Sequence, residues 1–297
     1  MSEVSVVIPT KNAGDQFGKL LNKIRSQSMV DTEIIIIDSG STDGTVDTGR
    51  KLADKIIEIS PNDFHHGRTR NIGAEAANGD IIAFTVQDAY PVTDTWLADL
   101  INPIETDVAD VTYGNQIAHP DAKPVDKFFY KYFYPDSNVK VTEDDTNDEA
   151  KFYLHNIFIS DVSSAISSSV WDKFQFQDNV DMSEDKDFAY RVANEGYDLY
   201  YCSDAEIYHS HDYSIRSLFL RRYKDGMAFK DITSPDSDDF ILNGIKYIVS
   251  EYEYLIRNNK SYWIPYAILY DFTYFISFIM GKNNEYIPDK LHKILSG

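Results

Sequence analysis

Apolar positions follow two alternating periods along the first third of the chain. Val4 to Ile8 is a continuous β-branched run that ends at a proline, and Glu33 to Ile37 repeats its character. Both runs are typical of buried parallel strands. Between them, apolar residues from Phe17 to Ile24 recur at helical spacing, and a weaker helix is expected at Thr45 to Ala53. The order of elements is therefore β-α-β-α.

The same alternation continues to residue 85. A third strand is expected near Ile56 to Ile59, a helix at Arg68 to Ala77, and a fourth strand at Ile81 to Thr85. Strands and helices that alternate in this way predict an α/β fold with a doubly wound sheet. In such a sheet, ligands bind beyond the carboxyl ends of the strands.

Beyond Asp94 the pattern becomes less regular. Phe128 to Tyr134 form an aromatic patch, and the acidic run from Glu143 to Glu149 is expected to be a solvated loop. A helix at Phe188 to Glu195 and a late strand at Leu199 to Ile207 follow.

From residue 215 onward the pattern is helical and aromatic. A break is expected at Thr233 to Asp239, where Ser, Pro and Asp cluster. We therefore expect a larger α/β domain at residues 1–226 and a helical, aromatic extension at residues 227–297.

Composition and charge exclude several classes of protein. The chain has 297 residues, 43% of them hydrophobic, which is too apolar for a disordered protein. Its formal net charge of −20 argues against nucleic acid as a partner, because an acidic surface repels a polyanion. The single cysteine, Cys202, excludes an internal disulfide and suits a reducing cytoplasm. No export signal is recognised at the amino terminus, so we expect a cytoplasmic protein.

Polar residues suited to a nucleotide follow the first two predicted strands. Pro9, Thr10 and Asn12 follow the first strand, and the second strand leads into Asp38 and a polar cluster that ends at Gly44. Alone, this cluster would be an Asx-type turn that caps a helix. Because neighbouring parallel strands end at one edge of the sheet, the two groups together predict a nucleotide-binding crevice.

Two arginines stand at the start of the predicted third helix. Arg68 and Arg70 lie in its first turn, where the helix dipole is already positive and added cations gain nothing. The simpler interpretation is that both face solvent. The alternative is an anion nearby, such as a pyrophosphate.

Acidic residues and a histidine stand at three further element ends. Asp88 follows the fourth strand, where one carboxylate suffices to hold Mg²⁺ or Mn²⁺ against two phosphates. Glu184 and Asp185 precede an apolar helix, which needs only one of them as a cap, and such a carboxylate can take a proton from an attacking hydroxyl. His209 follows the late strand, far enough from Asp185 for one helix and one strand to return it to the same sheet edge.

In this order, the motifs resemble those of the family-2 glycosyltransferases, and within them the rhamnosyltransferase-like branch. The similar stretches, within residues 4–226, are VSVVIPTKN, IIIIDSGSTDGT, FHHGRTRNIGA, QDAYP, SEDKDFAYRVANEGY and IYHSHDYS. The resemblance implies a GT-A fold for residues 1–226. It also implies transfer of a sugar from a nucleotide-diphospho-sugar donor to a hydroxyl of a glycan or lipid-linked acceptor. One displacement would invert the anomeric centre, so no nucleophilic side chain is required.

The resemblance also implies a role for each matching residue. Asp185 would be the general base, and Glu184 would help to hold the acceptor. Asp88 and His209 would hold a divalent cation, Mg²⁺ or Mn²⁺. The residues that would bind the donor nucleotide or its diphosphate are Pro9, Thr10, Asn12, Asp38, Arg70, Gln87, Arg221 and Arg222.

One motif departs from the family pattern. Many relatives carry two or three acidic residues where this chain reads Gln87, Asp88 and Ala89, so the cation would rest on Asp88, His209 and phosphate oxygens. The sequence Gln-Asp-Ala also occurs at this motif in the rhamnosyltransferase-like branch. It favours rhamnose or another deoxyhexose on dTDP or UDP as the donor, used in the assembly of a surface polysaccharide or glycoprotein glycan.

Two other functions fit part of the sequence. A sugar-nucleotide nucleotidyltransferase shares the nucleotide-binding sheet, but it carries a Gly-rich phosphate loop after the first strand, which Pro9 to Gly14 does not resemble. A catalytically inactive binding subunit would not need Asp38, Asp88, Asp185 and His209 together.

The aromatic helices expected from Ile241 to Leu295 predict contact with a membrane or with protein. Lys246, Arg257 and Lys260 are suited to anionic lipid. Amphipathic rings of the kind that settle at headgroup depth are Tyr247, Tyr252, Tyr254, Tyr262, Trp263, Tyr266, Tyr270, Tyr274 and Phe275. We expect these helices to bring the protein to the cytoplasmic face of a membrane. The same stripes also fit helices that pack on the larger domain or form a homodimer interface. Pro265 and Asp271 disfavour a true span.

Overall fold

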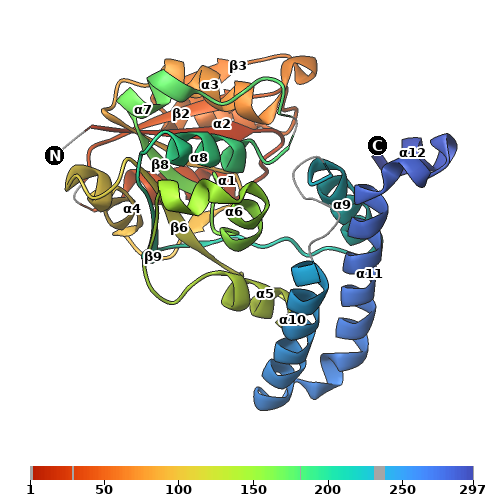
Figure 1. Ribbon diagram of the computed structural model, residues 1–297. Coiled ribbons are helices and arrows are strands. Elements are labelled where there is room, and N and C mark those ends of the chain that lie inside the picture. Colours follow the sequence, from red (N-terminus) through yellow and green to blue (C-terminus); the bar gives the residue numbers. More distant parts are fainter. Residues whose placement is uncertain (1–2, 29, 181, 231–237, 297) are drawn as a thin grey trace. The chain divides into compact units, whose positions relative to one another are not determined.

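The computed structural model describes residues 3–28, 30–180, 182–230 and 238–296. Internal contacts divide the chain into unit 1, residues 1–117 and 133–209, and unit 2, residues 118–132 and 210–297. Figure 1 labels many of the elements of both units. The domain boundary expected at residue 226 lies inside helix α9 (Ile215–Ala228) and stays a prediction.

Unit 1 is built on a mixed sheet with the strand order β3-β2-β1-β4-β8-β6-β9-β5, in which β7 also pairs with β9. The strands are β1 (Val4–Thr10), β2 (Thr32–Asp38), β3 (Lys55–Glu58), β4 (Ile81–Thr85), β5 (Tyr90–Pro91), β6 (Val111–Ile117), β7 (Val139–Val141), β8 (Ser163–Ser167) and β9 (Leu199–Tyr208). β3, β2, β1 and β4 are parallel, as the alternation of elements predicts. β8 is antiparallel to both β4 and β6, a change of direction that the sequence pattern does not predict.

Helices pack on this sheet (Figure 1). They are α1 (Phe17–Arg25), α2 (Thr45–Leu52), α3 (His66–Glu75), α4 (Trp96–Glu105), α6 (Glu149–His155), α7 (Ser168–Phe174) and α8 (Glu184–Asn194), with the short 3-10 helices η1 (Pro61–Asp63) and η2 (Glu143–Asn147). The acidic run expected to be a solvated loop forms η2 and the start of α6. Asp145 accepts a hydrogen bond from the Thr142 backbone N–H and closes the amino end of η2, so part of this acidity serves as a cap.

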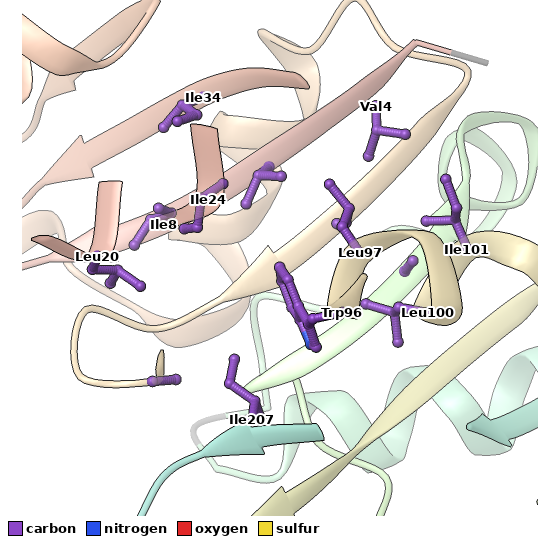
Figure 2. Close-up of a cluster of buried hydrophobic side chains, with 14 of the residues drawn as sticks. Val4, Ile8, Leu20, Ile24, Ile34, Trp96, Leu97, Leu100, Ile101 and Ile207 are labelled. Atoms are coloured by element: carbon purple, nitrogen blue, oxygen red, sulfur yellow. The ribbon is translucent and has the colours of Figure 1, made fainter. Parts of the chain in front are cut away.

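Alternate residues of β1 point to opposite faces of the sheet and contact different helices. Val6 and Ile8 belong to a buried core with α1 and α4 (Figure 2). On the other face, α3 approaches so closely that a Cβ on Gly73 would clash with Val7 and lie 2.6 Å from Ile37 Cδ1. This close contact fixes α3, and with it the arginines of its first turn, against the sheet.

Unit 2 is helical. Its elements are α5 (Pro124–Phe133), α9, α10 (Asp238–Arg257), η3 (Ser261–Trp263), α11 (Ile264–Lys282), η4 (Asn284–Tyr286) and α12 (Asp289–Ser296). α10 and α11 run side by side as a hairpin closed by η3 (Figure 1). Of the break expected at residues 233–239, positions 233–237 lie outside the described residues, and α10 begins at residue 238.

Candidate active site

The carboxyl ends of β1 and β2 meet in a buried hydrogen-bond network around Asp38, which is 1% exposed. Its Oδ1 accepts from the backbone N–H groups of Gly40 and Ser41, at 3.0 and 2.8 Å. Its Oδ2 accepts from the hydroxyls of Ser41 and Thr10, at 2.5 and 3.1 Å. A carboxylate has about four lone-pair positions, so the protein fills them. The Thr10 hydroxyl has a second acceptor, Ile37 O at 3.5 Å, and can release one position.

Asn12 joins this network from the loop after β1. Its φ of 50° lies in the left-handed region that asparagine tolerates better than most residues. Its side-chain oxygen accepts from the Thr42 N–H at 2.8 Å, and its own N–H donates to the Ser41 hydroxyl at 2.7 Å. The structure therefore brings the predicted residues Pro9, Thr10, Asn12 and Asp38 together at one sheet edge.

Gln87 connects the loop after β4 to the end of β1. Its Oε1 accepts from the Lys11 N–H at 2.8 Å, and its Nε2 donates to Lys11 O at 3.2 Å. These two bonds hold the loops together and leave the next residue, Asp88, exposed at the sheet edge. A direct contact between Gln87 and a nucleotide stays a prediction.

His209 stands directly after β9 and faces Asp88, with 4.0 Å between Nε2 and Asp88 Oδ1. Its backbone N–H donates to Ile117 O at the end of β6, at 2.9 Å. Its Nδ1 lies 2.9 Å from Gln116 Oε1, and an amide oxygen is an acceptor, so the ring proton is placed on Nδ1. The lone pair is then on Nε2, the ring nitrogen that lies 4.0 Å from Asp88 Oδ1. A carboxylate oxygen and an oriented imidazole nitrogen fit a divalent cation such as Mn²⁺.

A buried cluster of carboxyl groups surrounds Arg70. Its Nη1 donates to Glu184 Oε1 at 2.6 Å, and its Nε lies 3.2 Å from Asp161 Oδ2. All three residues are buried. Asp185 is half-buried beside them and accepts from the backbone N–H groups of Lys186 and Asp161, at 2.8 and 3.4 Å. The protein itself therefore supplies an anion for Arg70. Whether a donor also contacts Arg70 stays a prediction.

This cluster contains one guanidinium group and three carboxyl groups. Burial raises the pKa of Asp161 to about 7, an effect that Arg70 opposes and that Asp185 and Glu184 reinforce. Burial also raises the pKa of Asp185, with a further rise from Glu184 and opposition from Arg70 and Lys186. Burial lowers the pKa of Arg70, but its three carboxylate neighbours outweigh burial and leave that pKa raised. Asp185 is therefore a stronger base than an exposed aspartate.

Glu184 and Asp185 lie at the start of α8, which has no ordinary side-chain cap. Ser183, the residue before the helix, has φ 61° and makes no side-chain capping bond. This left-handed conformation costs about 1–2 kcal/mol for a residue other than glycine, and such strain is concentrated at functional sites. Asp187, also in the first turn, pairs with Arg191 at 2.9 Å. Glu184 and Asp185 remain directed to the Arg70 cluster.

Two residues of this site were not predicted from the sequence. Asp161 lies in an irregular stretch before β8, and its signal is a lone aspartate between Ser160 and Val162 without Gly or Pro beside it. Gln116 alternates on β6 like any strand residue, so its spacing carries no signal of its contact with His209. Asp161 contacts Arg70 and Gln116 contacts His209, so each contacts a predicted residue and neither belongs to a sequence motif.

Arg221 and Arg222 belong to α9 in unit 2. Both pair with Asp225, at 3.1 and 2.7 Å, and the Arg222 guanidinium lies 4.6 Å above the Tyr274 ring. Their part in binding the donor diphosphate stays a prediction.

The chain matches a known protein family. Residues 5–164, more than half of the chain, match the family model described as Glycosyl transferase family 2. The chain belongs to this family. This family-2 glycosyltransferase is 29% identical over 291 residues to the O-antigen chain rhamnosyltransferase RfbN of Salmonella typhimurium, covering 96% of this chain and 91% of the relative. The predicted family and enzyme class are confirmed, and they favour sugar transfer over the two alternative functions.

Solved structures confirm the predicted GT-A fold of this glycosyltransferase. The mannosyltransferase PcManGT from Pyrobaculum calidifontis, in complex with GDP-Man and Mn²⁺, matches with a TM-score of 0.59 at 17% identity, over 91% of this chain and 74% of that chain. S. aureus TarS in complex with UDP-GlcNAc matches with a TM-score of 0.56 at 14% identity, over 95% of this chain and 91% of that chain.

Asp161→Asn is expected to change how stability depends on pH. The pKa of Asp161 is about 7 in the folded protein against an ordinary 3.8, so folding takes up a proton between these values. The contribution of this carboxyl group to stability is therefore complete below about pH 4 and is lost as the pH rises through about 7. The asparagine variant does not lose this contribution. The difference between its free energy of unfolding and that of wild type, measured by urea denaturation, should therefore increase in favour of the variant as the pH is raised from about 4 to about 7.

Asp178→Asn serves as the matched control. The Asp178 side chain is 58% exposed and pairs with Arg68 at 3.1 Å, so its removal should change stability by less than about 1 kcal/mol at every pH. Parallel pH profiles for wild type and Asp161→Asn would show that the cluster retains no extra proton.

Proposed function

We propose that this glycosyltransferase moves rhamnose or another deoxyhexose from a dTDP- or UDP-linked donor to a hydroxyl of a glycan or lipid-linked acceptor, with inversion. The reaction would take place in the cytoplasm, in the assembly of a surface polysaccharide or glycoprotein glycan. The observation that carries the proposal is Asp185, a half-buried carboxylate of raised pKa in the Arg70 cluster. Similarity to an O-antigen chain rhamnosyltransferase over almost the whole chain supports the choice of sugar.

The donor nucleotide would lie against the network of Pro9, Thr10, Asn12 and Asp38. When the Thr10 hydroxyl turns from Asp38 to Ile37 O, one lone pair of the Asp38 carboxylate is released. That lone pair can accept a hydrogen bond from a base N–H or a ribose hydroxyl.

Asp88 and His209 would hold the divalent cation. Mn²⁺ fits this pair better than Mg²⁺, because Mg²⁺ strongly prefers oxygen ligands and one donor here is an imidazole nitrogen. A bound cation would supply charge stabilisation to the departing diphosphate. Gln116 orients the His209 ring, and Gln87 fixes the loop that carries Asp88.

Asp185 would act as the base in a single displacement. It takes the proton of the acceptor hydroxyl as the hydroxyl oxygen attacks the anomeric carbon, and the bond from that carbon to the diphosphate oxygen breaks. Backbone N–H groups of Asp161 and Lys186 hold the carboxylate in place. Arg70 and Asp161 would act as positioning residues, because their direct contacts are within the cluster. Glu184 would hold the acceptor, in addition to its bond to Arg70.

Asp185→Asn should lower turnover by about a hundredfold or more and leave donor binding nearly unchanged, since the amide keeps the shape and loses the base. Turnover is measured as release of nucleoside diphosphate, and binding by titration with the donor. Asp187→Asn is the matched control on the same helix, because Asp187 is paired with Arg191 at 2.9 Å and should leave turnover intact. Near-normal turnover of the Asp185 variant would remove this residue from the mechanism.

Asp88→Ala should abolish the Mn²⁺-dependent stabilisation by the donor. A panel of UDP-, dTDP- and GDP-sugars is tested for its effect on the melting temperature, and dTDP-rhamnose is expected to raise that of wild type most in the presence of Mn²⁺. The control is Asp47→Ala, because the Asp47 side chain is 76% exposed and its removal should keep the shift. An unchanged shift in the Asp88 variant would mean that the cation is held elsewhere. A larger shift with a GDP-sugar would replace the proposed donor.

A further inference from the structure

Helix α11 of unit 2 exposes apolar residues where a surface helix of a water-soluble protein exposes polar ones. Residues buried in α11 include Asp271, Thr273 and Ser277, which are 5%, 7% and 0% exposed. The exposed residues of α11 are all apolar, namely Pro265, Ile268, Leu269, Phe272, Ile276 and Ile279. A surface helix in water turns its polar side outward, whereas α11 exposes only apolar residues and buries three polar ones.

The exposed apolar residues line up along the helix. Ile268, Phe272, Ile276 and Ile279 follow each other at intervals of three and four residues, so they form one stripe. Phe272 is 64% exposed, and α10 adds exposed apolar residues of its own, including Ile256 at 58%. Soluble proteins rarely leave contiguous apolar surface of this kind uncovered.

Ionisable groups lie between the two helices. Glu251 of α10 is 0% exposed and Asp271 of α11 is 5% exposed. Burial raises the pKa of both carboxyl groups, and Asp271 raises that of Glu251 further. In helices surrounded by lipid, ionisable residues face the interior of the bundle and pair with one another, because the outside offers no water. The hairpin shows this arrangement.

The close packing of α9 and α11 follows the same pattern. Gly281 of α11 lies against Gly226 of α9, where an added Cβ would stand 3.1 Å from the Gly226 Cα. The hydroxyls of Thr273 and Ser277 donate to carbonyl oxygens of their own helix, both at 2.7 Å. Small residues at the crossing and hydroxyls satisfied within the helix are typical of helices that pack in membranes.

We propose that this hairpin docks on a membrane, with the apolar stripe of α11 in the hydrocarbon of one leaflet. The residues at the turn support lipid as the occupant, because Tyr262 and Trp263 are rings suited to headgroup depth and Arg257 and Lys260 are suited to anionic lipid. The stripe is aliphatic with one phenylalanine and contains no Tyr, Trp or Arg, which are enriched at protein interfaces together with Phe and Met.

The hairpin lies in the membrane surface rather than crossing it. By length and composition alone, Ser261–Lys282 is the one candidate for a membrane span among the described residues. Within unit 2, however, one face of α11 is packed on α9, and only its other face is left for lipid. An amphipathic helix with one apolar face is bound in the plane of the interface. This inference does not depend on the identity of donor or acceptor.

Flotation of the full chain with vesicles of phosphatidylethanolamine and phosphatidylglycerol tests the proposal. Wild type should float. Replacing Ile268, Phe272 and Ile276 together by Gln should lower the vesicle partition coefficient by about a hundredfold or more, because each side chain loses its burial in hydrocarbon. The matched control replaces the same three residues by Leu and should float like wild type. Val108→Gln, at an exposed position of unit 1, should also float.

The three side chains are at least 38% exposed, so the Gln variant should keep the melting temperature of wild type. Equal flotation of the Gln variant and wild type would overturn the proposal. It would also be wrong if wild type stayed unbound. In that case, a dimer by light scattering that the Gln variant converts to monomer would assign the stripe to a second copy of the chain.

Discussion

The charge balance around Arg70 is the constraint on which the proposed active site depends. A guanidinium and carboxylates are stable away from water only when they satisfy one another, and removal of one partner from a buried pair costs about 3–5 kcal/mol. Arg70 here meets Asp161 and Glu184 directly, with Asp185 beside them. Burial raises the pKa of Asp185, the negative charge of Glu184 raises it further, and the residue is half-buried. The proposed base for the acceptor hydroxyl would therefore depend on the same interactions that hold the cluster together.

The mixed sheet explains how residues distant in sequence reach this cluster. Gly73 lets α3 lie close to β1 and β2, which places Arg70 near the sheet. β8 runs antiparallel to β4, so Asp161, two residues before β8, comes to the sheet edge where β4 ends. The same edge carries the Asp38 network and the pair formed by Asp88 and His209. The proposed nucleotide, cation and acceptor sites therefore lie along one edge of the sheet, where ligands of open α/β sheets bind.

Much of the first half of the chain could be predicted because its signals are local. Continuous β-branched runs mark β1 and β2, and the polar residues that follow them meet because parallel strands end together. β8 could not be found in this way, since Ser163 to Ser167 is poor in residues that favour strands. The start of α3 left two interpretations of Arg70, a solvent-facing side chain or one near an anion, and spacing does not distinguish a ligand from a carboxylate of the chain. Similarly, the aromatic rings of α11 are evident in the sequence, whereas the face that it exposes is decided by its packing on α9.

The central claim is a single displacement with Asp185 as base, and the stereochemistry of the product tests it most directly. The product is made from a donor of known anomeric configuration, and its new linkage is assigned by NMR from the one-bond carbon–proton coupling at the anomeric centre. A linkage of configuration opposite to that of the donor is the result that this account predicts. Retained configuration would contradict it, because retention requires a different chemical course from direct attack by a hydroxyl that Asp185 deprotonates.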